Sequence, residues 1–256
     1  MTVAMGRTRQ LLIRLSGPLV LLAIWYIVAA SGLASSYLLP PPGRTFLRLG
    51  QMLTAGTVHS DIAASLLRWF VGYALGCVIG VPVGLLIGNS VVLYEASFPA
   101  IDFLRSLPVT ALFPLFLLIF GIGEGSKMAM AFTATVFVVI LNSASGAKQA
   151  SRTRQRTAKV FGASRWQVFR WIVFWEALPQ TLVGMRIALS LALIVVIVSE
   201  MFIGTRQGLG QRIYDAYSFN LTTDLYALLV ITGLLGFAMN RIFLFAEKRI
   251  VFWAGA

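Results

Sequence analysis

The segment from Lys148 to Pro179 holds the densest cluster of charged side chains in the chain, and its first acidic residue is Glu176. Long apolar runs flank it, and the hydrocarbon core of a bilayer does not readily accept so many charges. The segment is therefore expected in water or at a headgroup surface, where basic loops between spans most often serve only as positive-inside anchors. It contains seven of the 21 Lys and Arg residues: Lys148, Arg152, Arg154, Arg156, Lys159, Arg165 and Arg170.

Residues for acid-base or metal chemistry are scarce. His59 is the single histidine and Cys77 the single cysteine, which argues against a Ser/His/Asp triad, a cysteine metal cluster or an intrachain disulfide. The run Gly121 to Lys127, GIGEGSK, has a superficial likeness to a phosphate-binding loop. It fails the pattern because Ser126 separates Gly125 from the lysine and no strand precedes it. No catalytic residue, metal or cofactor is predicted, and ATP hydrolysis would belong to another chain.

The basic segment is predicted to fold as two short helices joined by a bend. Arg152 to Phe161 contains no helix breaker, and Gly162 is a natural stop because glycine tolerates a left-handed backbone. Ser164 and Gln167 have the spacing of a capping box, which predicts the start of a second helix. The bend would present Gly162 and its neighbours outward.

Composition places the rest of the chain in a membrane. Of its 256 residues 58% are hydrophobic and 12% charged, and the mean hydropathy is +0.84. Soluble domains carry about 25% charged residues, so an all-α polytopic membrane protein is predicted. The formal net charge of +12 does not require nucleic acid, because the basic residues cluster at alternate span ends near lipid headgroups.

About six transmembrane helices are expected. A cleaved signal peptide is the alternative for the first apolar run, and an uncleaved span is preferred because further spans follow. By parity, both termini and the basic segment lie on the cytoplasmic side, as the positive-inside rule requires. We expect residues 1–60 to form a tail, the first span and an external loop, and residues 61–250 to form the core. The six spans are Leu15 to Ala30, Ile62 to Gly88, Tyr94 to Phe120, Met128 to Ala147, Leu182 to Gly204 and Leu225 to Phe245.

A glycine repeat marks one face of the second span. Glycines at every fourth position remove the side chains from one stripe of a helix, so another helix can approach closely. Packing within one subunit is preferred to a role in lining a pathway. The five positions are Gly72, Gly76, Gly80, Gly84 and Gly88.

The third span is broken by prolines, which free backbone carbonyls that must be satisfied by protein or by a water-filled cavity. It is therefore the first candidate for a wall of a translocation pathway. In the fifth span, Glu200 is a functional candidate because it is charged, whereas snorkelling explains Arg186 equally well. Gly208 to Gly210 is expected to be a turn. The candidate pathway residues are Arg105, Pro108, Thr110, Pro114, Ser190 and Glu200.

Two motifs of the basic segment resemble a known family. Ala158, followed after three residues by Gly162-Ala163-Ser164-Arg165-Trp166 and later by Ala177-Leu178-Pro179-Gln180, is similar to the EAA loop of ABC-importer permeases. Arg105 to Pro108 and Pro114-Leu115 also resemble this family. Two positions depart from its pattern: Arg156-Thr157 stands in place of Glu-Ala, and Phe174-Trp175 in place of the first Leu-Pro.

The resemblance is to the branch of permeases for aliphatic sulfonates, taurine, nitrate and thiamine precursors. It implies a type I ABC importer permease fold in the bacterial inner membrane and no cofactor. It also implies a second permease copy, two cytoplasmic ABC ATPase subunits and a periplasmic or lipid-anchored substrate-binding protein. The basic segment would be the coupling helix that docks into an ATPase cleft. The implied coupling residues are Arg156, Ala158, Gly162, Ala163, Ser164 and Arg165.

Two other function classes fit the sequence less well. An ion-coupled secondary carrier or channel should have paired acidic residues at the membrane midplane, whereas the acidic residues here lie near span ends. An intramembrane enzyme would need a nucleophile facing a base, and no predicted span contains a histidine. The importer permease is therefore the favoured interpretation.

Overall fold

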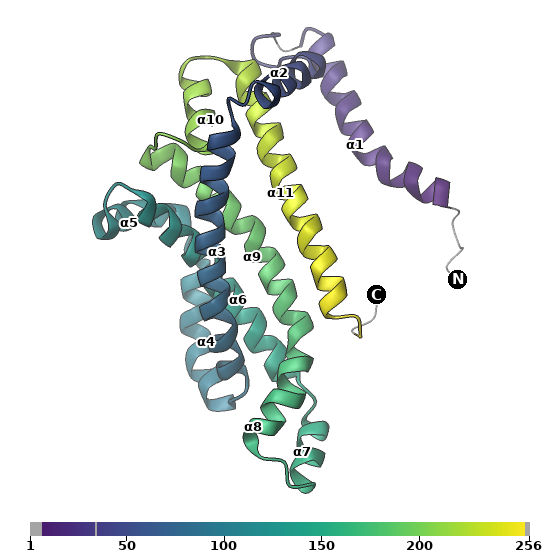
Figure 1. Ribbon diagram of the computed structural model, residues 1–256, viewed down its shortest axis with the longest axis vertical. Helices are drawn as coiled ribbons and strands as arrows, with labels where there is room; N and C mark the ends of the chain where they lie inside the picture. Colours follow the sequence, from purple (N-terminus) through teal and green to yellow (C-terminus); the bar gives the residue numbers. More distant parts are fainter. Residues whose placement is uncertain (1–6, 34, 254–256) are drawn as a thin grey trace. The chain divides into compact units, whose positions relative to one another are not determined.

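The computed structural model describes residues 7–33 and 35–253, and each regular element in these ranges is a helix (Figure 1). This confirms the predicted all-α fold. The chain forms two compact units, described in turn. Unit 1 comprises the chain up to His59 together with Ile213–Thr232, and unit 2 comprises Ser60–Arg212 with the chain from Gly233 onward.

Unit 1 contains α1, Arg7–Ala30, and α2, Pro42–Thr54. The helix α2 starts at a proline because the first helical turn needs no amide donor there. From α2, Arg48 Nε and Nη2 donate to Asp224 Oδ1 and Oδ2 at 2.7 and 2.8 Å. The Trp25 ring stacks on Tyr226 with centroids 5.9 Å apart. A charged pair and an aromatic pair therefore join the two chain segments of this unit.

Unit 2 is built around long helices that run beside one another (Figure 1). Most of its buried side chains come from α6 and α9, which pack along much of their length. Its elements are α3, His59–Gly88; α4, Val91–Ser106; η1, Val109–Leu112; α5, Phe113–Phe120; α6, Glu124–Gln149; α7, Arg152–Val160; α8, Arg165–Val168; η2, Phe169–Val173; and α9, Phe174–Ile203. The helices α10, Leu209–Ser218, and α11, Thr222–Ile250, begin in one unit and end in the other.

Four helices among the described residues are long and apolar enough to cross a membrane, and a bent pair could form a fifth span. The four are α3, the continuous helix Arg165–Ile203, α6 and α11. The first expected span corresponds to the shorter apolar stretch Ser16–Ala30 of α1. At 1.5 Å per residue such a stretch is shorter than a hydrocarbon core of about 30 Å, so it would need the flanking turns of α1 to cross.

The third predicted span is discontinuous. Its two halves, Val91–Ser106 and Val109–Phe120, meet at an angle of 79°. The break lies at Leu107 and Pro108, where the backbone is extended, as expected for a residue before proline. Pro99 lies inside α4, whereas Pro114 occupies the first turn of α5, where its missing amide costs no hydrogen bond. Of the three prolines, Pro108 therefore marks the bend.

Two predicted boundaries differ in the structure. The helix that contains the fifth expected span begins at Arg165 rather than at Leu182, because α8, η2 and α9 form one helix with Pro179 inside α9. Phe174-Trp175, at the position of the family's first Leu-Pro, contains no breaker, and a π-helical segment at Phe169–Val173 keeps the helix continuous. The predicted turn at Gly208 to Gly210 is instead the start of α10, because buried acceptors bind the amides of this first turn.

The five repeated glycines of α3 face α6. A Cβ atom added at Gly72 would lie 2.5 Å from Ala131 Cβ, and one at Gly80 would lie 3.0 Å from Val139 Cβ. At Gly84 and Gly88 the nearest atoms are backbone carbonyl oxygens of α6, those of Ile140 and Ala144. The helices approach this closely because the glycines have no side chain. In this structure the stripe packs within one subunit.

Candidate functional site

The basic segment is anchored to α9 by one carboxylate. Ser151 caps α7 by accepting a hydrogen bond from the Arg154 amide at 3.3 Å, and the Ser151 amide donates to Glu176 Oε2 at 2.6 Å. Arg154 Nη1 lies 3.0 Å from Glu176 Oε1. Behind these contacts, Val173 and Ala177 are fully buried in a core with Leu85. The start of α7 is therefore fixed to a rigid span.

The bend has the local chemistry that the sequence predicts. Gly162 has φ +84°, and the Ala163 amide donates to the Ala158 carbonyl at 3.0 Å, which closes the end of α7. Ser164 and Gln167 form a complete capping box, with bonds of 2.7 and 3.2 Å between each side chain and the other residue's amide. Because both helix ends are satisfied internally, the bend can keep its shape in water.

Large apolar side chains are exposed around this bend. Val160 and Phe161 are each 85% exposed, and Trp166 is 65% exposed. Exposed apolar side chains that cluster at one tip are typical of a protein interface rather than of a solvated loop. The tip therefore combines a rigid bend, an apolar surface and a surrounding group of cations.

The coupling residues implied by the resemblance all lie at or next to this bend. Arg156, Ser164 and Arg165 are exposed, whereas Ala158 and Ala163 are half-buried beneath the turn. Arg156 also lines a polar cavity of about 240 Å³ together with Lys148, Arg152 and Lys159. The position that carries Glu in the family pattern therefore adds a cation to an already basic surface here.

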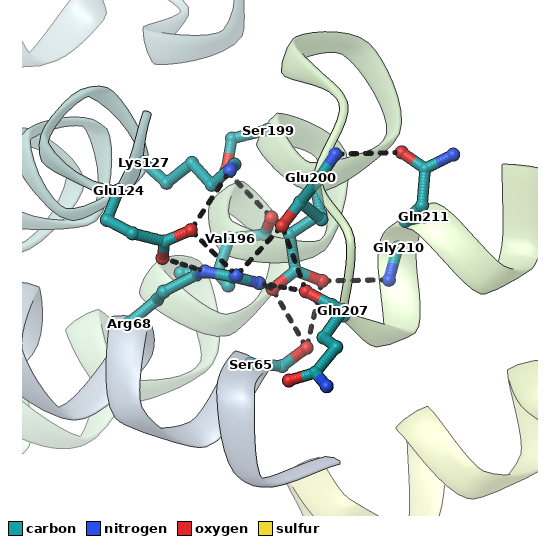
Figure 2. A network of polar contacts seen from close by, with 12 residues as sticks. Ser65, Arg68, Glu124, Lys127, Val196, Ser199, Glu200, Gln207, Gly210 and Gln211 are labelled. Atoms are coloured by element: carbon teal, nitrogen blue, oxygen red, sulfur yellow. Dashed lines mark hydrogen bonds and ion pairs between the residues drawn. The ribbon is translucent and has the colours of Figure 1, made fainter. Parts of the chain in front are cut away.

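A second constellation, which the sequence reasoning did not identify, lies in unit 2 around Arg68 of α3 (Figure 2). The Arg68 side chain is 5% exposed and all its donor atoms are used. Nη1 donates to Glu200 Oε1 at 2.6 Å and to the Gln207 carbonyl at 2.8 Å. Nη2 donates to Glu124 Oε1 at 2.9 Å and Thr205 Oγ1 at 3.0 Å, and Nε donates to Glu124 Oε2. One guanidinium therefore joins α3, α6, α9 and the loop before α10.

Glu200 is the buried carboxylate of this network, with no exposed surface. It accepts hydrogen bonds from Ser65 Oγ at 2.8 Å and from the Gly210 amide at 2.8 Å, in addition to Arg68. Gly208 and Gly210 allow the loop to approach, since a Cβ atom at either would lie 2.7 Å from an atom of the Glu200 side chain. This close approach brings the first turn of α10 onto α9. Glu200, a predicted pathway residue, is thus fully committed to contacts within its own chain.

Lys127 is also buried in this region, with 2% of its side chain exposed. Its Nζ atom lies 3.5 Å from Glu124 Oε1. A charge inside a membrane span is costly, so such residues are candidates for function by default. Arg68, flanked by apolar residues in the second predicted span, was the signal in the sequence that could have revealed the network.

The structure does not bring the other predicted pathway residues into this network. Arg105 is exposed and pairs with Asp102 at 2.8 Å on the same helix. Pro108, Thr110 and Pro114 are exposed along the bent pair, and Ser190 is exposed on α9. Their role in a pathway stays a prediction.

Comparisons with known proteins support the same interpretation as the geometry of the basic segment. The sequence model of the family described as "Binding-protein-dependent transport system inner membrane component" matches residues 80–252. The taurine transport system permease protein TauC of Escherichia coli is 30% identical over 253 residues, covering 97% of this chain and 92% of that protein. The nitrate import permease protein NrtB of Synechocystis is 30% identical over 241 residues, covering 91% and 86%.

A further relative is the putative aliphatic sulfonates transport permease protein SsuC of Bacillus subtilis, 29% identical over 242 residues, covering 92% of this chain and 85% of that protein. Among solved structures, an inward-facing MetNI methionine ABC transporter chain aligns with a TM-score of 0.63 and 22% identity, covering 77% of this chain and 95% of that chain. That likeness concerns the fold. The family match over most of the chain, the relatives and the shared helical fold together place this protein among the binding-protein-dependent transport system inner membrane components, as a multi-pass permease of an ABC importer.

Proposed function

We propose that this chain forms the translocation pathway of an ATP-driven importer for a small oxyanion or sulfonate, and that residues 148–179 couple it to a separate ATPase subunit. The observation that carries the coupling role is the bend at Gly162, where both helix ends are capped and Val160, Phe161 and Trp166 remain exposed. A solvated loop with no partner would not hold such side chains outward at a rigid tip.

The nature of the solute is inferred from the relatives. The printed names of three of them refer to taurine, nitrate and aliphatic sulfonates. Each of these solutes carries a sulfonate or a nitrate group, in which a negative charge is shared among several oxygens. Small solutes of this type are the proposed cargo, delivered by a substrate-binding protein on the side opposite the coupling segment.

The partners follow from the same proposal. In the described residues no group of three or more His, Cys, Asp or Glu could hold a metal ion. The run Gly121 to Lys127 contains a turn and the first residues of α6 rather than a phosphate loop after a strand. Because the family and the relatives are permease components of transport systems, we assign ATP hydrolysis to two cytoplasmic ATPase subunits, with a second permease copy completing the pathway and both termini of this chain in the cytoplasm.

The coupling role is tested by Gly162→Val. Gly162 has a left-handed backbone with φ +84°, which glycine adopts readily. This conformation costs other residues about 1–2 kcal/mol, and it costs β-branched side chains more. We expect normal membrane insertion but loss of ATPase copurification and of solute-stimulated ATP hydrolysis in proteoliposomes.

Two matched variants serve as controls. Gly162→Asn should retain most coupling because asparagine tolerates this backbone conformation, and Arg152→Ala should be mild because it removes only one exposed charge. A Gly162→Val permease that still binds its ATPase and transports solute would rule out docking through this bend.

A further inference from the structure

Glu124 differs from the other charged members of the Arg68 network in its exposure. Its side chain is 54% exposed, whereas those of Arg68 and Lys127 are 5% and 2% exposed and that of Glu200 is fully buried. Glu124 is the first residue of α6, so its side chain can turn toward solvent without moving a packed helix. The network therefore consists of three fixed charges and one carboxylate at its surface.

The atoms that hold Glu124 are arranged as a receptor for an oxyanion. Arg68 Nε and Nη2 contact its two carboxylate oxygens side by side, while Nη1 is occupied by Glu200 and the Gln207 carbonyl (Figure 2). A guanidinium edge of this kind recognises two oxygens of one anion at once. Lys127 Nζ lies 3.5 Å from Glu124 Oε1, the oxygen that Arg68 Nη2 also contacts.

Lys127 is incompletely satisfied in this arrangement. An ammonium group has three donors, and within the described residues the contact with Glu124 at 3.5 Å is the hydrogen bond found for Nζ. A carboxylate offers two oxygens, both already bound by Arg68. A sulfonate or nitrate group has a third oxygen, which could accept from Lys127 while the other two occupy the Arg68 edge.

The charge balance also requires an anion at this position. The buried carboxylate of Asp61, next to this network, is paired with Arg212 at 2.9 Å. Without Glu124, the remaining buried charges of Arg68, Lys127 and Glu200 sum to +1, and an uncompensated buried charge is strongly unfavourable. The amino end of α6, a 26-residue helix, adds a favourable field for negative charge. The position occupied by the Glu124 carboxylate is therefore electrostatically suited to an anion.

Within unit 2 this position lies far from the coupling segment. The helix α9 starts at Phe174 within the coupling segment and reaches Glu200 only in its last turn, Arg68 lies in the first third of α3, and Glu124 is the first residue of α6. In the topology proposed above, that end is external, where a binding protein would release its cargo.

We propose that Glu124 occupies an oxyanion-binding site of this permease, and that the sulfonate or comparable group of the solute displaces it from Arg68 and Lys127 as the solute enters. This inference rests on the proposed function, because it assigns a site to the anionic cargo. The carboxylate acts as an internal competitor that neutralises the site when no solute is present.

The test is isothermal titration of the full-length permease in lipid nanodiscs with sodium methanesulfonate at constant ionic strength. If Glu124 holds the site about 90% of the time, its removal should raise the apparent affinity about tenfold. Glu124→Gln should therefore bind methanesulfonate about tenfold more tightly than the unaltered protein. Glu95→Gln makes the same substitution in an exposed carboxylate paired with Lys148, and it should leave the affinity unchanged.

A second variant tests the receptor itself. Adding Lys127→Met to Glu124→Gln should abolish the gain, while the thermal midpoint of each variant shows whether it is folded. If folded Glu124→Gln binds no better than the unaltered protein, Glu124 is only a structural contact and the proposal is wrong. An equal gain in Glu95→Gln would indicate a nonspecific charge effect and would also overturn it. Because the titration needs no ATPase, failure here is distinguishable from failure of the coupling role, which Gly162→Val tests.

Discussion

Replacing Gly84 by alanine should separate two helices by a predictable amount. A Cβ atom at this position would lie 2.5 Å from the Ile140 carbonyl oxygen and 2.7 Å from Ser143 Cβ. Carbon and oxygen atoms in weak contact lie about 3.3–3.6 Å apart, so α3 and α6 would have to separate locally by roughly 1 Å. The neighbour is backbone, which cannot rotate away as a flexible side chain would.

The expected cost follows from two opposing effects. Forcing an extra methyl group into a packed interface costs about 1–3 kcal/mol. Alanine in a helix interior is favoured over glycine by about 0.8–1.0 kcal/mol. We therefore expect Gly84→Ala to lower the free energy of unfolding by up to about 2 kcal/mol. Gly80→Ala should cost less, because its nearest atoms, at 3.0 Å, belong to the Val139 side chain.

Gly233→Ala is the matched control for this series. It lies in the interior of α11 with nothing within 4 Å of the added Cβ, so the same substitution should be neutral or slightly stabilising. The measurement is unfolding of the purified permease in mixed detergent micelles, monitored by circular dichroism. If Gly84→Ala and Gly233→Ala unfold at the same midpoint, close packing of the glycine stripe does not contribute to stability.

Two further predictions concern the network and the topology. Glu200→Ala should destabilise the permease by about 3–5 kcal/mol because it leaves the buried Arg68 guanidinium partly unpaired. Lys148→Ala breaks an exposed pair and should cost under about 1 kcal/mol. A similar loss of stability in both variants, measured by the same unfolding assay, would contradict the burial argument. In a background lacking Cys77, a cysteine introduced at Arg154 should react with an impermeant maleimide only from the cytoplasmic side, and a cysteine at Gly125 should react only from outside. Labelling of both positions from one side would refute the topology.

The coupling segment shows which structural features can be predicted from neighbouring residues alone. Its cues act over a few residues: Gly162 permits the left-handed turn, and Ser164 and Gln167 satisfy each other's amides. Such short-range chemistry can be read from spacing, and the structure confirmed both the bend and the capping box. The end of the second helix could not be read in this way, because continuation through Pro179 depends on how α9 packs on α6.

The discontinuity of the third span could also be predicted from local sequence. Proline restricts the conformation of the residue before it, so breaks at Pro99, Pro108 and Pro114 were expected from the sequence. Which of the three prolines would bend the chain could not be predicted, since Pro99 is accommodated inside α4 and Pro114 in the first turn of α5. The angle of 79° belongs to the tertiary structure.

By itself, the sequence determined the membrane character, the all-helical fold, the exposed basic bend and the glycine face of α3, because apolar runs, charge clusters and fixed spacings are local properties. Only the tertiary structure revealed the network of Arg68, Glu124, Lys127 and Glu200. Arg68 and Glu200 are 132 residues apart in the chain, and each looks like an isolated charge in an apolar helix. Helix packing buries both side chains at one place, where water is excluded and each charge must be compensated by another within the protein.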